Sequence, residues 1–403
     1  MMPHALAQAV EFATSAMAVA GIGYFLAAML SARIFIALRR VQLPPFAPSV
    51  SILKSLKGVD PGMIDAFRSH CHQQYAGEYE LLFGVSSMGD PAVSVVGELK
   101  QEFPDLAIRL IECPERLGSN GKVSTLAQLV PQARHEFLLI NDSDITVSPR
   151  YLERVMVAFS QPRVARRRNP QPVGLVTALY RGHASRTMAS RFEALGIATD
   201  FQPNVLLSRI LEGGLQYGLG STLAVRREAL ERVGGFRSLV DHLADDYELG
   251  ARIAKKGYTV ALSAEVVETS TPAYTWRGFA DHQLRWLRTV RDARPRGYAG
   301  LICTHALAWA LLNVLASGLS PLSLWLLAMV FFLRLTLAMM VGAEVLGDHQ
   351  IVGNLWLLPL RDLTAFGFWI AGFAGNTVVW RGERFIVRNG LLQTAERPHQ
   401  SQI

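Results

Sequence analysis

The chain is predicted to be an α/β protein joined to membrane helices, and three observations lead to this prediction. Between Pro44 and about Tyr298, segments with strand character alternate with segments that begin like helices. Repeated strand–helix units form a parallel sheet covered by helices. Long apolar segments flank this region, and half of the 403 residues are hydrophobic while only 18% are charged. That balance favours a membrane protein over a soluble one.

Four strands are predicted in the first half of the domain, over residues 50–56, 79–85, 106–111 and 137–140. A capping residue precedes a proline at Asp60-Pro61, Asp90-Pro91 and Ser148-Pro149, and this order marks the first turn of a helix. These four strands are expected to form a nucleotide-binding half. The second half, from Val173 onward, is expected to form the acceptor side.

The N-terminal apolar segment, Phe12 to Leu38, is longer than the core of a signal peptide and long enough to span a bilayer. Arg39 and Arg40 follow it, so the positive-inside rule places the next domain in the cytoplasm. We therefore expect a membrane helix within residues 10–40 and a cytoplasmic domain over residues 44–298. A bacterial-type inner membrane is the expected location.

About three further membrane or re-entrant helices are expected within residues 301–380. Residues 301–346 are apolar and are broken near Gly318 and Pro321, which predicts a helical hairpin. Residues 351–380 contain Pro359, Arg361 and Asp362. This stretch is either one span after an interfacial segment or a re-entrant pair. A basic cytoplasmic tail is expected over residues 381–403.

Charge and cysteine usage argue against a nucleic-acid-binding protein, a cysteine metal site and a disulfide-stabilised fold. The net charge of +7 comes mostly from arginines near apolar segments, which suits an anionic membrane surface better than nucleic acid. An arginine-rich stretch at residues 163–168 reads as a solvated loop, with attraction to lipid headgroups as the alternative. Cys71, Cys113 and Cys303 lack metal-site spacing and indicate a reducing compartment without disulfides.

Asp142-Ser143-Asp144 is the most informative motif, because it directly follows the apolar strand at residues 137–140. Ligands bind at the carboxyl ends of the strands in open α/β sheets. Aspartates are common in turns, which is the competing interpretation. Two converging carboxylates would repel unless a cation lay between them, and Mg²⁺ or Mn²⁺ prefers such oxygen ligands and bridges to phosphates. Asp144 is the expected direct ligand, with Asp142 beside it.

Three other residues are expected near the donor. Asp60 and Asp90 are placed as helix caps, and a cap at this sheet edge also faces the nucleotide crevice. Lys122, in Gly118-Ser119-Asn120-Gly121-Lys122, follows a loop that opens a helix. It is either an ordinary solvated lysine or a group that helps to hold phosphates at a helix N-terminus.

The second half of the domain carries two further motifs. Asp245-Asp246 begins a helix, where one acid would satisfy the macrodipole, so the pair indicates an additional role such as proton abstraction from an acceptor hydroxyl. His282-Gln283-Leu284-Arg285-Trp286 lies on a basic helix with an apolar stripe from Trp276 to Val290. That helix is expected at the membrane interface. There, Arg285 would steady a leaving diphosphate and Trp286 would pack beside the acceptor.

Two acidic sites, a cationic aromatic motif and a membrane region, in this order, suggest a sugar-nucleotide transferase acting on a lipid. The same set, with Lys57-Gly58-Val59-Asp60 ahead of it and Trp380-Arg381-Gly382 behind it, resembles the ceramide glucosyltransferases and their hopanoid-associated bacterial relatives. His282 replaces the usual arginine or glutamine, and residues 199–203 lack the histidine of the animal enzymes.

The resemblance implies a GT-A fold, a UDP-sugar donor, a divalent cation and an inverting displacement with Asp246 as the base. It implies transfer of a hexose, glucose or N-acetylglucosamine, to a hydroxyl of ceramide, hopanoid or another membrane lipid. Two alternatives stay open: a processive polysaccharide synthase, and a membrane protein that binds nucleotide sugars without catalysis. The oligomeric state is left undetermined by the sequence.

Overall fold

The computed structural model of the chain describes residues 4–161, 172–380 and 383–394. Its centre is an eight-stranded mixed sheet in the order β3-β2-β1-β4-β7-β6-β8-β5. Strands β1 to β4 are mutually parallel and β6 pairs in parallel with β8, whereas β7 runs antiparallel between β4 and β6. The strands are β1 (Val50–Ser55), β2 (Tyr79–Val85), β3 (Ala107–Glu112), β4 (Phe137–Ile140), β5 (Ile145–Thr146), β6 (Val173–Ala184), β7 (Leu223–Arg226) and β8 (Thr259–Thr271).

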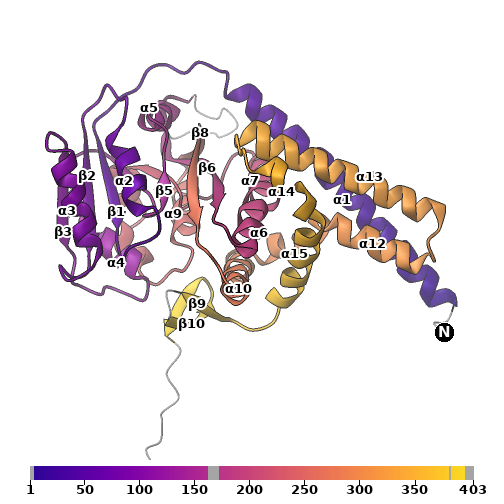
Figure 1. Cartoon of the computed structure of the whole chain (residues 1–403). Coiled ribbons are helices and arrows are strands. Elements are labelled where there is room, and N and C mark those ends of the chain that lie inside the picture. The colour runs from indigo at the N-terminus through magenta and orange to yellow at the C-terminus, as the bar shows by residue number, and fades with distance from the viewer. Residues whose placement is uncertain (1–3, 162–171, 381–382, 395–403) are drawn as a thin grey trace, which may run out of the picture.

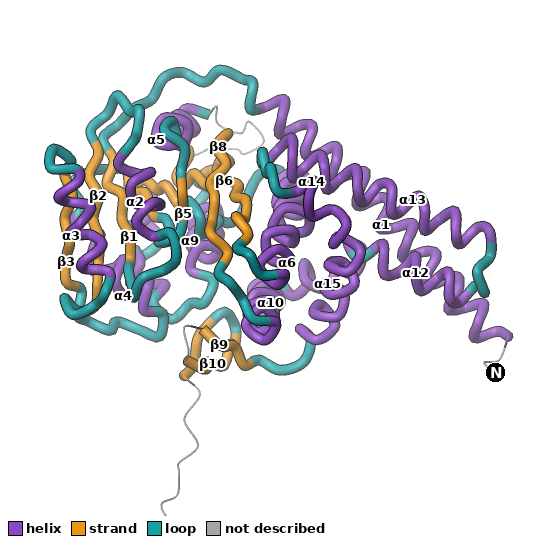
Figure 2. Tube along the Cα trace, viewed as in Figure 1, coloured by secondary structure: helices purple, strands orange, loops and turns teal. Residues whose placement is uncertain are grey.

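The sheet separates two hydrophobic cores, because successive side chains of a strand point to opposite faces. Ile52 belongs to the core under the first group of helices, and its neighbour Leu53 belongs to the core under the second group. The first group is α2 (Met63–Cys71), α3 (Ala92–Glu102) and α5 (Tyr151–Val157). The second is α4 (Gly121–Leu129), α8 (Arg227–Arg232) and α9 (Asp245–Lys255). Figure 2 shows α2, α3, α4, α5 and α9 around the orange strands.

The four strands predicted in the first half are confirmed within a residue or two. Of the two aspartates expected to cap helices, only Asp90 does so, because its Oδ1 accepts the N–H of Ala92 at 2.8 Å. Asp60 does not cap α2, which begins at Met63 after a left-handed Gly62 (φ 76°). The carboxylate of Asp60 instead accepts the hydroxyl of Ser143 at 2.7 Å.

The second half inserts helices between β6 and the membrane region. Helix α6 (Met188–Gly196) continues through a π-helical turn, η3 (Ile197–Phe201), into α7 (Gln202–Leu211). Helix α10 (Trp276–Ala293) follows β8, and α11 (Pro295–Gly300) leads to the membrane helices. The apolar stripe of α10, predicted to lie at the membrane interface, is buried only in its middle: Phe279 and Gln283 are buried, whereas Trp276 and Val290 at its ends are exposed. Phe279 packs against α6 and α15, which draws the middle of this face into the protein interior.

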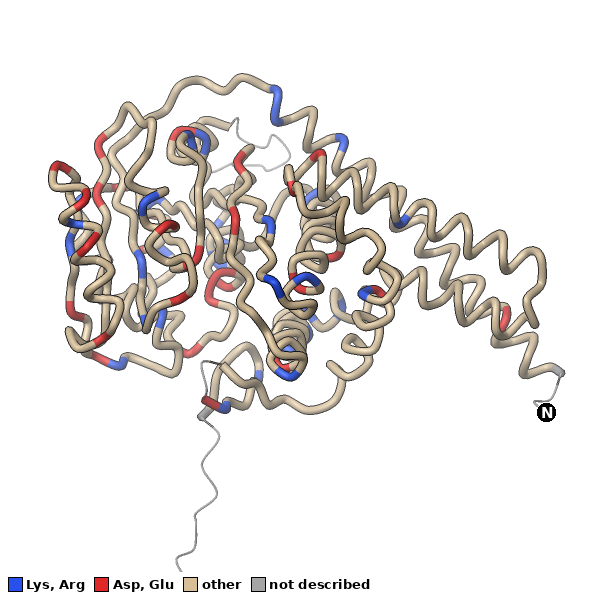
Figure 3. The backbone as a smooth tube through the Cα atoms, in the orientation of Figure 1, with Lys and Arg blue, Asp and Glu red and all other residues tan. Residues whose placement is uncertain are grey.

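Within the described residues, two helices are long and apolar enough to cross a membrane: α1 (His4–Leu38) and the segment Pro321–Val345. The second comprises α13 (Pro321–Met339) and a π-helical turn, η6 (Met340–Val345). With α12 (Ala306–Ala316), they project from the domain as an arm that carries few charged side chains (Figures 1 and 3). Arg39 donates to the carbonyl of Val345 at 2.7 Å, so α1 and the second segment meet the domain at the same end.

The predicted hairpin is present, because α12 ends at Ala316 and Ser320 caps α13. Of the about three C-terminal membrane or re-entrant helices that we expected, one segment of the described residues, Pro321–Val345, is by itself long and apolar enough to span a membrane. A second C-terminal span exists only if the bent pair Pro295–Thr304 and Ala306–Ala316, at 55°, is counted as one. After α14 (Ile351–Asn354), α15 (Leu358–Gly372) has fifteen residues where a span needs about twenty, and its Arg361 and Asp362 are buried.

The C-terminal segment, expected to be an apolar stretch and a basic tail, contains a small antiparallel sheet. Its strands are β9 (Thr377–Trp380), β10 (Glu383–Arg388) and β11 (Leu391–Thr394). Val378, Phe385, Val387 and Leu392 form a hydrophobic cluster with Leu243, just ahead of α9. The sheet therefore packs beside α10, on the domain rather than away from it (Figure 2).

Candidate active site

Acidic side chains from both halves of the domain meet at the carboxyl ends of β1 and β4. Asp142 follows β4, and Lys122 of α4 donates to its Oδ1 at 2.6 Å. The same ammonium group lies 3.9 Å from Asp245 Oδ2 at the start of α9. Burial would lower the pKa of Lys122, but the carboxylates of Asp142 and Asp245 outweigh it and raise that pKa. Lys122 is therefore a permanent cation between two acids.

The loop before Lys122 is held by the segment that precedes α9. Asn120 caps α4 by accepting the N–H of Val123 at 3.1 Å, and its amide nitrogen donates to the carbonyl of His242 at 2.8 Å. Ser119 donates its N–H to Asp241 Oδ1 at 2.8 Å. The expected position of Lys122 near a helix N-terminus is thus present. Asn120, which buries its side chain in this contact, is a site residue that the sequence analysis missed.

Asp144 lies in a more enclosed environment than Asp142. Its Oδ2 accepts the hydroxyl of Thr269 on β8 at 2.5 Å. Burial raises the pKa of Asp144, and the charge of Asp142 raises it further. The charge of Asp60, whose carboxylate is bound to Ser143 of the same turn, acts in the same direction. Three acids thus surround this turn, and their mutual repulsion favours any cation that binds there.

Asp246 is held in a fixed orientation by two backbone donors. Its Oδ2 accepts the N–H of Gly220 at 2.7 Å and its Oδ1 accepts the N–H of Tyr247 at 2.8 Å. Burial, with the charge of Asp245, raises the pKa of Asp246 to about 6. A Cβ atom on Gly220 would lie 3.1 Å from Asp246 Oδ2 and 3.6 Å from Asp142 Oδ2. The two carboxylates therefore face each other across this glycine.

A close backbone contact brings α9 to this position. A Cβ atom on Gly250 would lie 2.2 Å from the backbone nitrogen of Gly218, so α9 can approach the 217–220 turn only with glycine there. Asn141 fixes the other side of the turn, because its side chain donates to the carbonyl of Ser221 at 2.7 Å. The turn at residues 217–222 is a second element that the sequence analysis missed.

The described residues contain no group of three or more histidine, cysteine or acidic side chains arranged to hold a metal ion. Asp142 and Asp144 nevertheless fit a divalent cation of the Mg²⁺ type. They offer hard oxygen ligands, and the charge of one raises the pKa of the other. Mg²⁺ usually binds through one or two carboxylates and completes its shell with water and phosphate oxygens. Two carboxylates are therefore a sufficient protein contribution.

The loop after β1 is organised by Asp90, which faces the same sheet edge. Both carboxylate oxygens of Asp90 lie 3.0 Å from the backbone nitrogen of Gly58, which donates to them. Beside this loop, Glu383 of the C-terminal sheet forms long ion pairs with Lys57 at 3.9 Å and Arg116 at 3.6 Å. A pocket of about 400 Å³ lies there, lined by Arg116, Leu117, Gly118, Ser119, Asp241 and Glu383.

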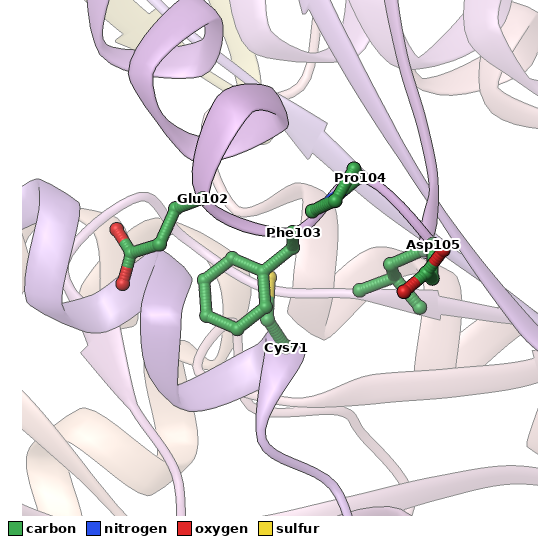
Figure 4. Close-up of a pocket in the computed structure, with 6 residues that line it drawn as sticks. Cys71, Glu102, Phe103, Pro104 and Asp105 are labelled. Carbon is green, nitrogen blue, oxygen red and sulfur yellow. The ribbon is translucent and has the colours of Figure 1, made fainter.

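A second pocket, of about 280 Å³, lies at the opposite end of the sheet. Figure 4 shows its lining between Cys71 at the end of α2 and residues 102–106, which precede β3. Strand β3 begins there, whereas the acidic residues follow the ends of β1 and β4. Because it contains none of the acidic cluster, we do not assign it to the active site.

The α10 motif is anchored by Glu193, a buried residue of α6 that the sequence analysis missed. Gln283 donates to Glu193 Oε2 at 2.6 Å, and His282 Nδ1 lies 3.4 Å from Oε1. The ring of His282 also packs against Trp286, with centroids 5.3 Å apart. His282 thus substitutes for the family's usual residue while keeping a charged partner within reach.

Tyr274 connects this motif to the acidic turn. Its ring lies 5.4 Å from that of His282. Burial raises the pKa of Tyr274 most, and the charge of Glu193 raises it further. The charge of Arg285 lowers this pKa, and that of Asp144 raises it. The charges of Arg285 on α10 and of Asp144 after β4 therefore both act on Tyr274.

Lys54 is a further residue that the sequence analysis missed. It is almost fully buried on β1, and its ammonium group donates to the carbonyl of Asp142 at 3.1 Å. Burial lowers the pKa of Lys54 to about 7, although Asp142 and Asp144 favour its charged form. A lysine at a core position of a predicted strand is the signal that could have identified it, since lysine is almost never fully buried without a partner.

The fold has a solved counterpart in a mannosyltransferase, PcManGT from Pyrobaculum calidifontis, whose structure contains GDP-Man and Mn²⁺. The two structures align with a TM-score of 0.54 and 21% sequence identity, over 89% of this chain and 97% of the other. The mixed sheet and its helices define a GT-A fold, as expected. The chain belongs to Glycosyl transferase family 21, whose family model matches residues 13–392. It is therefore a glycosyltransferase.

The curated relatives agree with this assignment and with the expected resemblance. The chain is 26% identical over 356 residues to ceramide glucosyltransferase 3 of Caenorhabditis elegans, covering 84% of this chain and 72% of the relative. It is 24% identical over 273 residues to beta-monoglucosyldiacylglycerol synthase of Synechocystis, covering 65% of this chain and 52% of that relative.

Proposed function

We propose that the protein is a membrane-bound inverting glycosyltransferase that transfers a hexose, glucose or N-acetylglucosamine, from a UDP-sugar to a hydroxyl of a membrane lipid. The names of the relatives, ceramide glucosyltransferase and beta-monoglucosyldiacylglycerol synthase, support a lipid acceptor. The observation that carries the proposal is the fixed carboxylate of Asp246, with its pKa of about 6, beside the acidic turn at Asp142. Two candidate membrane helices adjoin the domain that holds it.

In this mechanism Asp246 is the general base. Its carboxylate accepts the proton of the lipid hydroxyl while that oxygen attacks the anomeric carbon from the face opposite the diphosphate. The new carbon–oxygen bond forms as the bond to the diphosphate breaks, and the bonding electrons leave with UDP. A base with a pKa near the working pH is the efficient choice, because it is ionised yet still basic. The backbone donors from Gly220 and Tyr247 support this role by fixing the carboxylate.

The residues of the acidic edge are proposed to bind the donor. Asp144 and Asp142 would hold a Mg²⁺ or Mn²⁺ ion, which supplies positive charge beside the diphosphate. The Mn²⁺ and GDP-Man in the mannosyltransferase structure support a cation and a nucleotide sugar for this fold. Lys122 exchanges its contact with Asp142 for a phosphate oxygen, and Arg285 steadies the leaving diphosphate.

The remaining residues are proposed to position the two substrates. Asp60 and Asp90 border the nucleoside, since each is tied to a loop at the sheet edge: Asp60 through Ser143 and Asp90 through Gly58. Trp286 packs beside the acceptor. The domain is proposed to face the cytoplasm, where UDP-sugars are available to it.

Mass spectrometry of reaction products tests the proposal. The purified full chain in lipid nanodiscs is given UDP-glucose or UDP-N-acetylglucosamine with ceramide, diacylglycerol or a hopanoid alcohol. A single glycosylated lipid that forms only with wild type, and not with Asp246→Asn, supports the proposal. Sugar polymer in place of a monoglycosylated lipid would instead favour a polysaccharide synthase, and no product with any pair would contradict lipid transfer.

A further inference from the structure

Four charged side chains meet where the membrane arm joins the catalytic domain. Arg334 comes from the middle of the membrane segment Pro321–Val345, Arg361 and Asp362 come from α15, and Asp200 comes from the π-helical turn η3. We call this set the charged junction. Only 3% of Arg334 is exposed. An ionisable side chain inside a membrane helix is costly and is usually retained for a function.

Arg334 uses its whole guanidinium group in this junction. Its Nε and Nη2 donate to the two oxygens of Asp362 at 2.8 and 2.6 Å, and Nη2 also donates to Asp200 Oδ1 at 2.6 Å. Its Nη1 donates to the backbone carbonyl of Thr199 at 2.7 Å. This planar fork cannot be reproduced by the single ammonium group of lysine. The membrane helix is thereby hydrogen-bonded to the backbone of η3.

Arg361 holds the same turn from the other side. Its Nη2 lies 3.0 Å from Asp200 Oδ2, and its Nε donates to the carbonyl of Phe192 at 3.1 Å. A Cβ atom on Gly196 would lie 2.1 Å from Arg361 Nη2, so a glycine is needed there for the guanidinium to approach. The turn is therefore clamped between two arginines, one from α13 and one from α15.

The turn ends at Phe201, which contacts Trp286 of the α10 motif. The Phe201 ring lies 5.4 Å from that of Trp286 and 5.6 Å from that of Tyr180. Tyr180 is buried on β6. Burial is the largest cause that raises the pKa of Tyr180, and the charges of Glu193 and Asp246 raise it further. Phe201, Trp286 and Tyr180 thus form an aromatic cluster at the end of η3, which we call the aromatic wall. π-Helical turns of this kind occur frequently at functional sites.

We infer that Arg334 is a positioning residue for the lipid acceptor: it sets η3, and through η3 the aromatic wall past which the acceptor's hydroxyl reaches Asp246. This inference rests on the proposed lipid-acceptor function. The proposed donor residues, Lys122 on α4 and Asp142 after β4, share no hydrogen bond or ion pair with the charged junction among the described residues. Loss of Arg334 should therefore impair use of the acceptor and spare use of the donor.

Kinetics on the full chain in nanodiscs test the inference with Arg334→Gln. The probes are UDP-glucose as donor and dioleoylglycerol or N-oleoylsphingosine as acceptor. We expect the acceptor KM to rise by about tenfold or more, because small misplacements of a binding group have effects of this size. The donor KM and the lipid-independent hydrolysis of UDP-glucose should stay within about twofold of wild type, as expected when donor contacts are unchanged.

Two further variants make the test decisive. Phe201→Leu leaves the charged junction intact and should raise the acceptor KM in the same way, so the inference is tested even if Arg334→Gln does not fold. Arg33→Gln removes a membrane-helix arginine whose ion pair with Glu344 (3.0 Å) is exposed, and it should behave as wild type. An unchanged acceptor KM in the first two variants, or an equal loss of transfer and donor hydrolysis, overturns the inference. A wild type that hydrolyses donor but glycosylates neither lipid contradicts the proposed function instead.

Discussion

At the scale of single residues, the site is a set of partly buried acids, and nearby cations compensate their charges unequally. Asp142 and Asp245 share the cation of Lys122, whereas the hydrogen-bond donors to Asp246 within the described part of the chain are two backbone N–H groups. Unequal compensation of neighbouring carboxylates separates their pKa values and allows one of them to act as a base. The raised pKa of Asp246 follows from its burial and the nearby charge of Asp245.

Replacement of Asp246 by asparagine keeps the size of the side chain and removes its basicity. We expect Asp246→Asn to fold and bind UDP-sugar while its transfer rate falls by ~10²–10⁴-fold, the usual contribution of a positioned base. Donor binding by calorimetry and transfer by product assay measure the two effects. If Asp246→Asn stays near wild type while Asp245→Asn is inactive, the base is Asp245.

The pH dependence of wild type follows from the same group. The base acts in its ionised form, so protonation below a pKa of about 6 should remove activity and deprotonation above it should restore activity. We expect kcat/KM to rise with pH and to level off above about 6. A profile that is flat between pH 5 and about pH 7 would exclude Asp246 as the base whose ionisation is measured.

The proposed cation site makes a second prediction at this scale. Asp144→Ala should abolish transfer, because the turn would keep too few oxygen ligands for Mg²⁺ or Mn²⁺. Wild type should lose activity in excess chelator and regain it when Mn²⁺ is added back. Asp65→Ala is the matched control, since Asp65 is an exposed surface acid on α2. Full activity of wild type in chelator would refute the requirement for a cation.

At the scale of elements, glycine contacts determine how α9 reaches the site. Gly250→Ala would place Cβ 2.2 Å from the backbone of Gly218, so either the helix or the turn must shift. Overpacking of this kind typically costs ~1–3 kcal/mol, and here the displacement also moves Asp246. We expect a lower Tm together with reduced transfer, measured by thermal unfolding and product assay.

Gly97→Ala is the matched control for that variant. Gly97 also lies inside a helix, α3, but a Cβ atom there has no neighbour within 4 Å. Alanine at an open helix position is more favourable than glycine by ~0.5–1 kcal/mol, so stability should be unchanged or higher. Equal effects of the two substitutions would show that close packing of α9 is not what places Asp246.

At the scale of the whole molecule, the two candidate membrane helices meet the domain at one end, so we expect the domain to lie on one side of the bilayer. Arg39 and Arg40 predict that this side is cytoplasmic. A cysteine introduced in the Arg163–Arg168 loop, which lies outside the described residues, should react with an impermeant reagent only after cells are opened. Cys71 and Cys113 are buried and give little background. Labelling in intact cells would contradict a cytoplasmic active site.

The sequence by itself determined what depends on short segments of chain. The strands at residues 50–55 and 137–140, the helix break at Gly318 and the acids that follow β4 were predictable, because periodicity, turn residues and caps act over a few residues. The position of Lys122 at a helix start was predictable for the same reason.

Only the tertiary structure decided which distant segments meet. Asp60 binds Ser143, 83 residues away, and does not cap α2 as predicted. Arg334 binds the turn at Asp200, 134 residues away, and Glu193 holds Gln283 across 90 residues. The burial of Phe279 and Gln283 on α10 and the position of the C-terminal sheet also depend on such contacts. Pairings of this kind arise from the packing of the whole chain, since no local pattern specifies which surface will cover an apolar face or neutralise a charge.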